Sequence, residues 1–165
     1  MRTANIVVAV RGNHREIADL LRHIAAQDFT GRIEMILVDN HRRRRISPSV
    51  LAEAGLAGTV VHEPRPGLSR ARNTGVEHVT GEFVLFTDPD SRPHPGWASA
   101  QVRTLIETGT HCAGGRVAPL FVGFSEPAAL EPGLAQFFVP PDWPSEPCEL
   151  RPPFWLVGCN LATRS

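Results

Sequence analysis

Two carboxylates stand on either side of a proline near the middle of the chain, at Asp88 and Asp90. They follow the apolar run Phe83–Phe86, which is typical of a buried strand. Pro89 holds the residue before it in an extended conformation, so the turn is stiff and keeps the two carboxylates near each other. Carboxylate oxygens favour Mg²⁺ or Mn²⁺, with water and phosphate in the remaining positions. The pattern predicts a divalent-cation site for a phosphorylated ligand; the alternative is a surface turn that caps the next helix.

Arginine and glycine dominate the segment ahead of that strand, Gly67–Gly75. A helix N-terminus with an arginine nearby attracts phosphate, because its free N–H groups and the helix dipole favour an anion. Arg72 and Asn73 are the candidates here, whereas Arg70 fits an ordinary solvated helix face. Gly75 costs about 1 kcal/mol relative to Ala in mid-helix, which predicts that this helix approaches the sheet closely.

The first half of the chain alternates short apolar runs with segments of helical periodicity. This alternation predicts an α/β fold in which a mostly parallel central sheet is flanked by helices. The expected strands are Ile6–Val10, Ile33–Val38, Thr59–His62 and Phe83–Phe86. Three helices are expected. The first starts from an Asn13–Glu16 capping box and buries Ile17, Leu20, Leu21 and Ile24. The second is capped by Ser69 and has Leu68, Ala71, Gly75, Val76 and Val79 on one side, and the third is Pro95–Thr108.

Two strand-ending carboxylates are expected at one edge of this sheet. Asp39 follows the second strand and Asp88 follows the fourth. Because the strands are parallel, their carboxyl ends meet at the same edge, where ligands bind in open α/β sheets. This placement favours the metal interpretation of Asp88 and Asp90 over a capping turn.

The composition is that of an ordinary globular domain, with 165 residues, 42% of them hydrophobic, and a formal net charge of zero. A neutral chain has no global attraction to nucleic acid or to an anionic membrane, and no nucleic-acid partner is expected. The run Arg42–Arg45 could bind a phosphate or an acidic acceptor, but a solvated loop is the preferred interpretation. Cys112, Cys148 and Cys159 lack metal-ligand spacing and are expected to be free thiols. No apolar run suits a signal peptide or a transmembrane segment, which predicts a cytoplasmic protein.

Taken together, these segments resemble the nucleotide-binding part of a family-2 glycosyltransferase, which has the Rossmann-like A-type glycosyltransferase fold. The order and spacing of the pieces carry the resemblance, which covers nearly the whole chain. The pieces are Val7–Val10 leading to Asn13, Met35–Asp39, Gly67 with Ala71–Gly75, Gly81–Asp90, Pro95 with Trp97, Gly114–Val117, and Gly158–Ala162.

The resemblance implies a nucleotide-diphosphate sugar as donor and a divalent cation, Mg²⁺ or Mn²⁺, as cofactor. Asp90 would hold the metal on the diphosphate, and Asp88 would face the ribose and the metal. The family's reaction is an inverting transfer of the sugar to an acceptor hydroxyl, with departure of the metal-bound diphosphate. The other donor-site candidates are Val10, Asn13, Asp39 (for the base or ribose), Gly67, Arg72, Asn73 and Gly115.

By the same resemblance, residues 1–165 form a single domain that is short at its C-terminus. Residues 1–117 would be the nucleotide-sugar-binding half, and residues 118–165 an irregular acceptor-side segment. The stretches Val10–Gly12 and Asn40–Arg45 depart from the family's pattern around the base and ribose, so the identity of the donor stays open. The sequence does not identify the acceptor either.

No catalytic base is assigned. In the family an acidic pair follows the segment that resembles Gly158–Ala162, whereas this chain stops at Ser165. A catalytically inactive nucleotide-sugar-binding module is therefore the main alternative. A chain that is a fragment would lack the acidic pair as well. A phosphatase of the haloacid dehalogenase type ranks lower, because it needs Asp-x-Asp near the start of its domain and a later Lys, which this chain lacks. A nucleotidyltransferase also ranks lower, since Val10–Asn13 matches its glycine-rich basic loop poorly.

Overall fold

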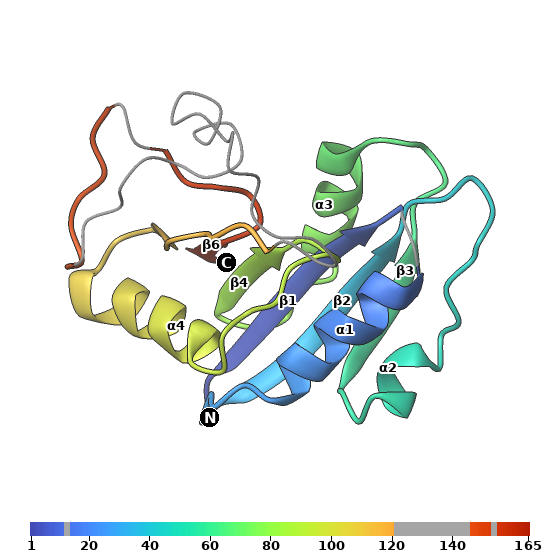
Figure 1. Cartoon of the computed structure of the whole chain (residues 1–165), viewed down its shortest axis with the longest axis horizontal. Coiled ribbons are helices and arrows are strands. Elements are labelled where there is room, and N and C mark those ends of the chain that lie inside the picture. The colour runs from blue at the N-terminus through green and yellow to red at the C-terminus, as the bar shows by residue number, and fades with distance from the viewer. Residues whose placement is uncertain (12–13, 121–145, 153–154) are drawn as a thin grey trace.

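A computed structural model describes residues 1–11, 14–120, 146–152 and 155–165. The described residues form a six-stranded sheet with helices on both faces, in the strand order β3-β2-β1-β4-β6-β5 (Figure 1). The strands are β1 Thr3–Val10, β2 Arg32–Asp39, β3 Gly58–His62, β4 Phe83–Thr87, β5 Cys112–Gly114 and β6 Leu161–Arg164, and the helices are α1 His14–Ala25, α2 Val50–Glu53, α3 Leu68–Val76 and α4 Trp97–Thr108.

The sheet is mostly parallel, as the sequence predicts. Strand β1 pairs in parallel with β2 and β4, and β2 pairs in parallel with β3. Strand β6 runs antiparallel to β4 and to β5, between which it lies. All four expected strands are confirmed. Strand β6 was not expected, because its four residues carry too short a pattern to predict a strand without the two neighbours that pair with them.

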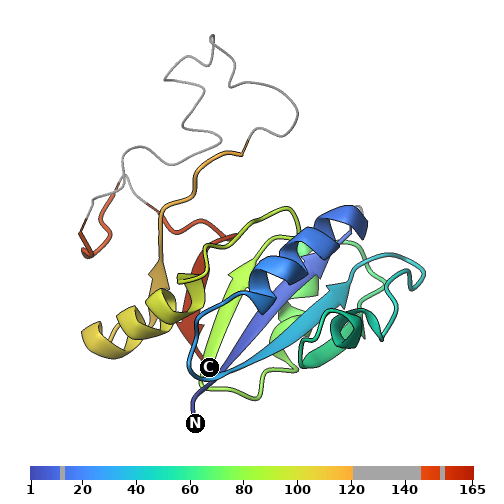
Figure 2. The same ribbon diagram turned by 60° about the horizontal axis from the view of Figure 1, so that its bottom comes forward.

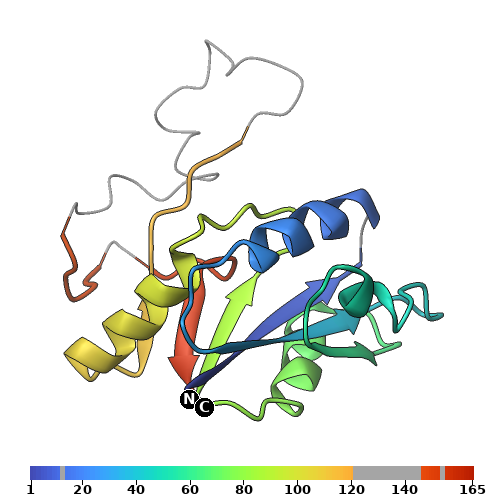
Figure 3. The ribbon, with the colours of Figure 1, turned by 90° about the horizontal axis from the view of Figure 1, so that it is seen from below.

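The alternation of side chains along β1 separates two apolar layers. Ala4, Ile6, Val8 and Val10 belong to a large core that also includes residues of α1, α2 and α4. Val7 and Ala9 belong to a smaller core on the opposite face, with Ala71 of α3. Figures 2 and 3 show α1 and α3 on opposite sides of the sheet. A strand buried on both faces explains the continuous apolar run in this part of the sequence.

Helix α1 buries the expected stripe. Ile17, Leu20, Leu21 and Ile24 are each at most 2% exposed. The Asn13 part of the expected capping box lies outside the described residues. Helix α4 begins at Trp97 rather than at Pro95, with Gly96 as its N-cap residue. In the described part of the chain, no helix is both long and apolar enough to cross a bilayer.

Helix α3 departs from the prediction at its start. Gly67 is the N-cap residue with φ 145°, a conformation that favours glycine, and no side chain caps the helix. The predicted Ser69 cap is wrong, because Ser69 already lies inside the first turn. Leu68 and Val76 are 52% and 44% exposed, so the expected apolar side is only partly buried.

The residues of α3 that face the sheet are small. Ala71 and Gly75 are buried, and a Cβ atom on Gly75 would lie 2.4 Å from Cγ1 of Val7 and 3.1 Å from Cγ2 of Val38. The close approach predicted from Gly75 is therefore confirmed. This contact fixes the distance of α3, and of the arginines that it carries, from the sheet.

Candidate functional site

The strand order reverses between β1 and β4. Strands β2 and β3 extend from one side of β1, and β4 follows on the other side. A crevice outside the carboxyl ends of strands at such a switch point is where ligands bind in open α/β sheets. Val10 ends β1 and is fully buried, while Asp88 directly follows the end of β4. Asp39 pairs with Val10 in register, so both predicted carboxylates lie at this edge.

Arg72 connects three parts of the structure at this edge. Its Nη2 donates to Oδ1 of Asp88 at 2.8 Å and to the carbonyl oxygen of Gly158 at 3.0 Å. A Cβ atom on Gly158 would lie 2.6 Å from Nη1, so the guanidinium packs directly on the backbone of this glycine. The Nε atom of Arg72 is buried and has no hydrogen-bond partner among the described residues. A fixed guanidinium with an unused donor is suited to bind an anion.

Asp90 stands two residues after Asp88, the carboxylate that Arg72 binds. It is exposed, and its carboxylate has no hydrogen-bond or ion-pair partner within the described residues. Burial raises the pKa of the Cys159 thiol, and the negative charges of Asp88 and Asp90 raise it further. The thiol is therefore near both carboxylates and stays protonated at neutral pH.

The donor set suits a metal that also binds phosphate. Within the described ranges no three His, Cys, Asp or Glu side chains form a cluster that could hold a metal ion. Mg²⁺ is commonly held by one or two carboxylates, with phosphate oxygens and water completing its shell. Asp88 and Asp90 match that requirement, so a metal here would depend on the ligand's phosphates.

The turn that carries Gly158 and Cys159 is held from its far side by Asn160. Oδ1 of Asn160 accepts hydrogen bonds from Nε1 of Trp97 at 2.8 Å and from Nε2 of Gln101 at 2.5 Å. Nδ2 of Asn160 donates to the carbonyl oxygen of Arg116 at 3.1 Å. A Cβ atom on Gly115 would lie 3.2 Å from Nδ2 of Asn160, so Gly115 permits this close contact. The turn is thus fixed between α4 and the end of β5.

Asp39 is occupied by the loop that follows it. It is fully buried, and its Oδ1 accepts the N–H of His41 at 3.2 Å and lies 2.7 Å from Nδ1 of that histidine. Its Oδ2 accepts the N–H groups of Arg45 at 2.6 Å and Ile46 at 3.0 Å. Burial raises the pKa of Asp39, but these donors together lower it below its usual value. Both oxygens therefore anchor the loop, and direct contact with a base or ribose stays a prediction.

Two further residues hold the segment that leads into α3. Asn40 is buried; its Nδ2 donates to the carbonyl oxygens of Glu63 at 2.8 Å and Arg65 at 2.9 Å, and its Oδ1 accepts the N–H of Gly67 at 2.9 Å. Glu63 accepts hydrogen bonds from Nε and Nη2 of Arg65 and from the hydroxyl of Thr74. The bonds from Arg65 lower the pKa of Glu63 to about 2.

Asn40 and Glu63 support the site and were not predicted from the sequence. The available signal was an acid and two prolines directly after a strand, at Glu63–Gly67. Of the other predicted residues, Asn73 does not face the same way as Arg72. Asn73 is exposed, and neighbouring helix residues do not face the same way. Asn13 lies outside the described residues.

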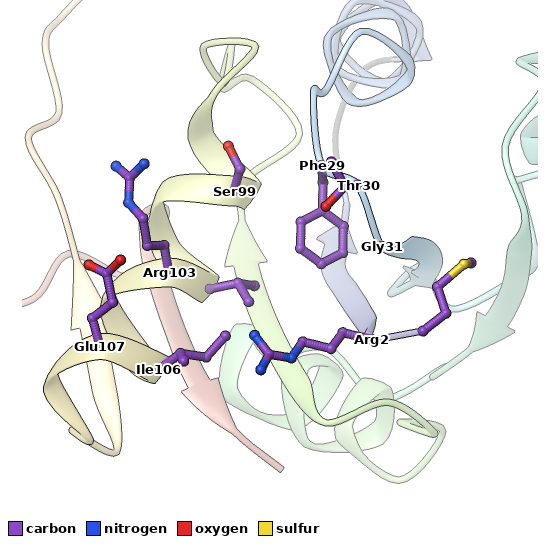
Figure 4. A pocket seen from close by; sticks show the side chains of 10 residues that line it. Arg2, Phe29, Thr30, Gly31, Ser99, Arg103, Ile106 and Glu107 are labelled. Carbon is purple, nitrogen blue, oxygen red and sulfur yellow. The ribbon is translucent and has the colours of Figure 1, made fainter.

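A separate hollow of about 510 Å³ lies at the opposite, amino edge of the sheet (Figure 4). Arg2 and Phe29 line one side of it, and Ser99, Arg103 and Ile106 of α4 line the other. These residues precede β1 and β2 or lie on α4, away from the carboxyl ends of the strands. The hollow is therefore not part of the switch-point site.

Residues 5–135 match the family described as Glycosyl transferase family 2, and the chain belongs to this family. Glycosyltransferase AglE of Haloferax volcanii is 26% identical over 117 residues, which are 68% of this chain and 38% of AglE. The mannosyltransferase PcManGT from Pyrobaculum calidifontis, solved in complex with GDP-Man and Mn²⁺, superposes with a TM-score of 0.58 at 27% identity. That match covers 66% of this chain and 34% of PcManGT.

The fold is the A-type glycosyltransferase fold, as expected. S. aureus TarS 1–349 superposes with a TM-score of 0.59 at 22% identity, over 73% of this chain and 39% of TarS. The chain thus spans less than two fifths of the length of each of these three relatives.

Proposed function

We propose that the switch-point site binds a nucleotide-diphosphate sugar with a divalent cation and serves the inverting transfer of its sugar to an acceptor hydroxyl. One observation carries this proposal. The guanidinium of Arg72 is fixed between Asp88 and Gly158 and keeps a buried donor without a partner in the described residues. The exposed Asp90 follows Asp88 by two residues. A cation and a carboxylate side by side match a diphosphate that carries its own metal.

Each residue has a distinct part in this proposal. Asp90 and Asp88 would hold Mg²⁺ or Mn²⁺, which would neutralise charge on the departing diphosphate. Arg72 donates to diphosphate oxygens and stabilises the negative charge that grows there as the bond to the sugar breaks. Asn40 and Gly67 keep the start of α3 in place, so that Arg72 needs no rearrangement during the reaction. The complex of PcManGT with GDP-Man and Mn²⁺ supports a donor and a metal of this kind for the present chain.

We place the acceptor on the β5 side of the site. A cavity of about 830 Å³ lies beside β5, and Gly115, Arg116, Trp155 and Leu156 are among its lining residues. Leu156 stands two residues before Gly158, which limits their separation to about 7 Å of extended chain. Trp155 is 54% exposed and offers a flat apolar surface of the kind that sugar rings stack on.

Binding without transfer is the second candidate. Asp88 and Asp90 would be used by the metal, and Glu63 is engaged by Arg65 and Thr74. Among the described residues, no other carboxylate is placed beside Arg72 to take a proton from an acceptor. The two candidates share the donor site and differ only in turnover.

Calorimetry tests the shared part. GDP, UDP, CDP and dTDP, and a sugar conjugate of each, would be titrated with Mn²⁺ and again with a chelator. Metal-dependent binding of one nucleotide is expected, and it would identify the base. Release of that nucleotide from its sugar conjugate, with and without sugar acceptors, would then separate transfer from binding alone. Absence of binding by every nucleotide would overturn both candidates.

A further inference from the structure

The loop between β2 and α2 carries an uncompensated positive charge. Arg42–Arg45 are all exposed, and none of them forms an ion pair with a residue that the structure describes. By contrast, Arg65 and Arg72 each bind a carboxylate. Four adjacent guanidinium groups repel one another, so a surface of this kind attracts anions even though the whole chain is neutral. Residues 41–46 form the arginine loop.

The backbone of the arginine loop is fixed at its base. Oδ2 of the buried Asp39 accepts the N–H groups of Arg45 and Ile46, and Oδ1 accepts the N–H of His41. Ile46 is itself only 2% exposed and packs in the large core. The arginine side chains are therefore presented from an ordered backbone, which lowers the entropy cost of binding through them.

An exposed apolar side chain lies next to this loop. Asn40, directly before the arginine loop, accepts the N–H of Gly67. Leu68 follows Gly67 and is 52% exposed. Figure 1 shows the cyan loop after β2 beside the green segment that leads into α3. The side chain of Arg65 in that segment is 69% exposed as well. Basic residues and an exposed leucine thus share one end of the molecule.

We propose that this surface, the arginine loop with Arg65 and Leu68, docks on a bilayer of anionic lipids. Clusters of four or more arginines attract anionic headgroups. Each arginine near the surface raises the partition coefficient about fivefold. Leu68 would enter the interfacial region beside them. A single-stranded nucleic acid would need aromatic stacking partners, and the exposed aromatic side chain of the described chain, Trp155, lines the cavity beside β5 instead. Because the surface lies at the carboxyl edge, docking would bring the switch-point site next to the lipid.

Vesicle sedimentation tests the proposal. The whole chain would be mixed with vesicles of phosphatidylcholine alone and with vesicles containing a third phosphatidylglycerol, at low and at high salt. Binding is expected only to the anionic vesicles and should weaken as salt rises, because the attraction is screened. The triple variant Arg42→Gln, Arg43→Gln, Arg44→Gln should lose roughly 100-fold in partition coefficient, and the single variant Arg43→Gln about fivefold.

A matched control removes the same charge elsewhere. The variant Arg22→Gln, Arg32→Gln, Arg103→Gln also replaces three exposed arginines and should keep most of the vesicle binding. Equal binding to both vesicle types, or equal losses in the two triple variants, would overturn the proposal. So would a triple loop variant that keeps vesicle binding but loses affinity for free nucleoside diphosphates, which would assign the loop to the donor. The vesicle result does not depend on nucleotide binding, so either proposal can fail alone.

Discussion

Arg72 donates to Asp88 across the carboxyl edge of the sheet, and the two charged atoms lie 2.8 Å apart. The pair is partly shielded, with 22% and 33% of the two side chains exposed. It joins α3 to the end of β4, and a second bond from the same nitrogen joins both to Gly158. The pair therefore sets where the cationic and the metal-binding halves of the proposed donor site stand relative to each other.

Replacing Arg72 tests its role toward the diphosphate. Arg72→Ala should weaken metal-dependent nucleoside diphosphate binding by about 1.5–3 kcal/mol, the range of hydrogen bonds to charged groups. Arg70→Ala removes an exposed arginine two residues earlier on the same helix and should change the affinity little. Isothermal calorimetry of both variants gives the comparison. Equal affinities in the two variants would remove Arg72 from the donor site.

Replacing Asn40 tests the support beneath α3. Asn40→Ala leaves the carbonyl oxygens of Glu63 and Arg65 and the N–H of Gly67 without their partner. A loss of about 2–3 kcal/mol in the free energy of unfolding is expected, since unsatisfied buried groups cost about 1–3 kcal/mol. Asn40→Asp should be no better, because a carboxylate cannot donate to the two carbonyls. Urea denaturation measures both, and a variant as stable as the wild type would contradict this account.

The close contact of α3 with the sheet makes a separate prediction. Gly75→Ala adds a methyl group 2.4 Å from Cγ1 of Val7, and overpacking of this kind costs about 1–3 kcal/mol. The double variant Gly75→Ala, Val7→Ala removes the nearer obstructing methyl group and should lose less than the sum of the two single losses. A double-mutant cycle in urea measures the coupling. Strict additivity would show that the contact is looser than the structure has it.

Acid should destabilise the fold through Glu63 and Asp39. Hydrogen bonds from Arg65 lower the pKa of Glu63 to about 2, and despite burial the backbone donors of the arginine loop lower the pKa of Asp39. The unfolded chain binds these protons near pH 4, so it takes them up first as the pH falls. The stabilisation is full above about pH 5 and should be lost between about pH 4.5 and 2. Melting temperatures across this range should fall less steeply for Glu63→Gln, and an unchanged slope would argue against the assignment.

Much of the fold is predictable because its strands are buried on both faces. Ile6–Val10 and Met35–Val38 are continuous apolar runs, a pattern that few other structures require. Strand β6, in contrast, depends on its pairing with β4 and β5 rather than on its own four residues. Ser69 failed as a cap because a glycine two positions earlier already provides the backbone turn.

The sequence predicts which residues form the site but not which residues they contact. The carboxylates at Asp39 and Asp88 lie at the predicted edge because strand ends fix them there. Their partners come from distant positions, such as Arg72 for Asp88 and the N–H of Ile46 for Asp39. No local pattern encodes such contacts. The sequence therefore did not predict that Asp39 is buried and bound by the loop that follows it.

The most direct test of the central claim pairs the metal with Asp90. The affinity of the tightest-binding nucleoside diphosphate would be measured with Mn²⁺ and with a chelator, for the wild type, for Asp90→Asn, and for Glu107→Gln as an exposed control on α4. Mn²⁺ is expected to strengthen binding in the wild type and in the control but not in Asp90→Asn, whose melting temperature should stay near that of the wild type. An equal gain from Mn²⁺ in all three proteins would contradict a metal site at Asp90.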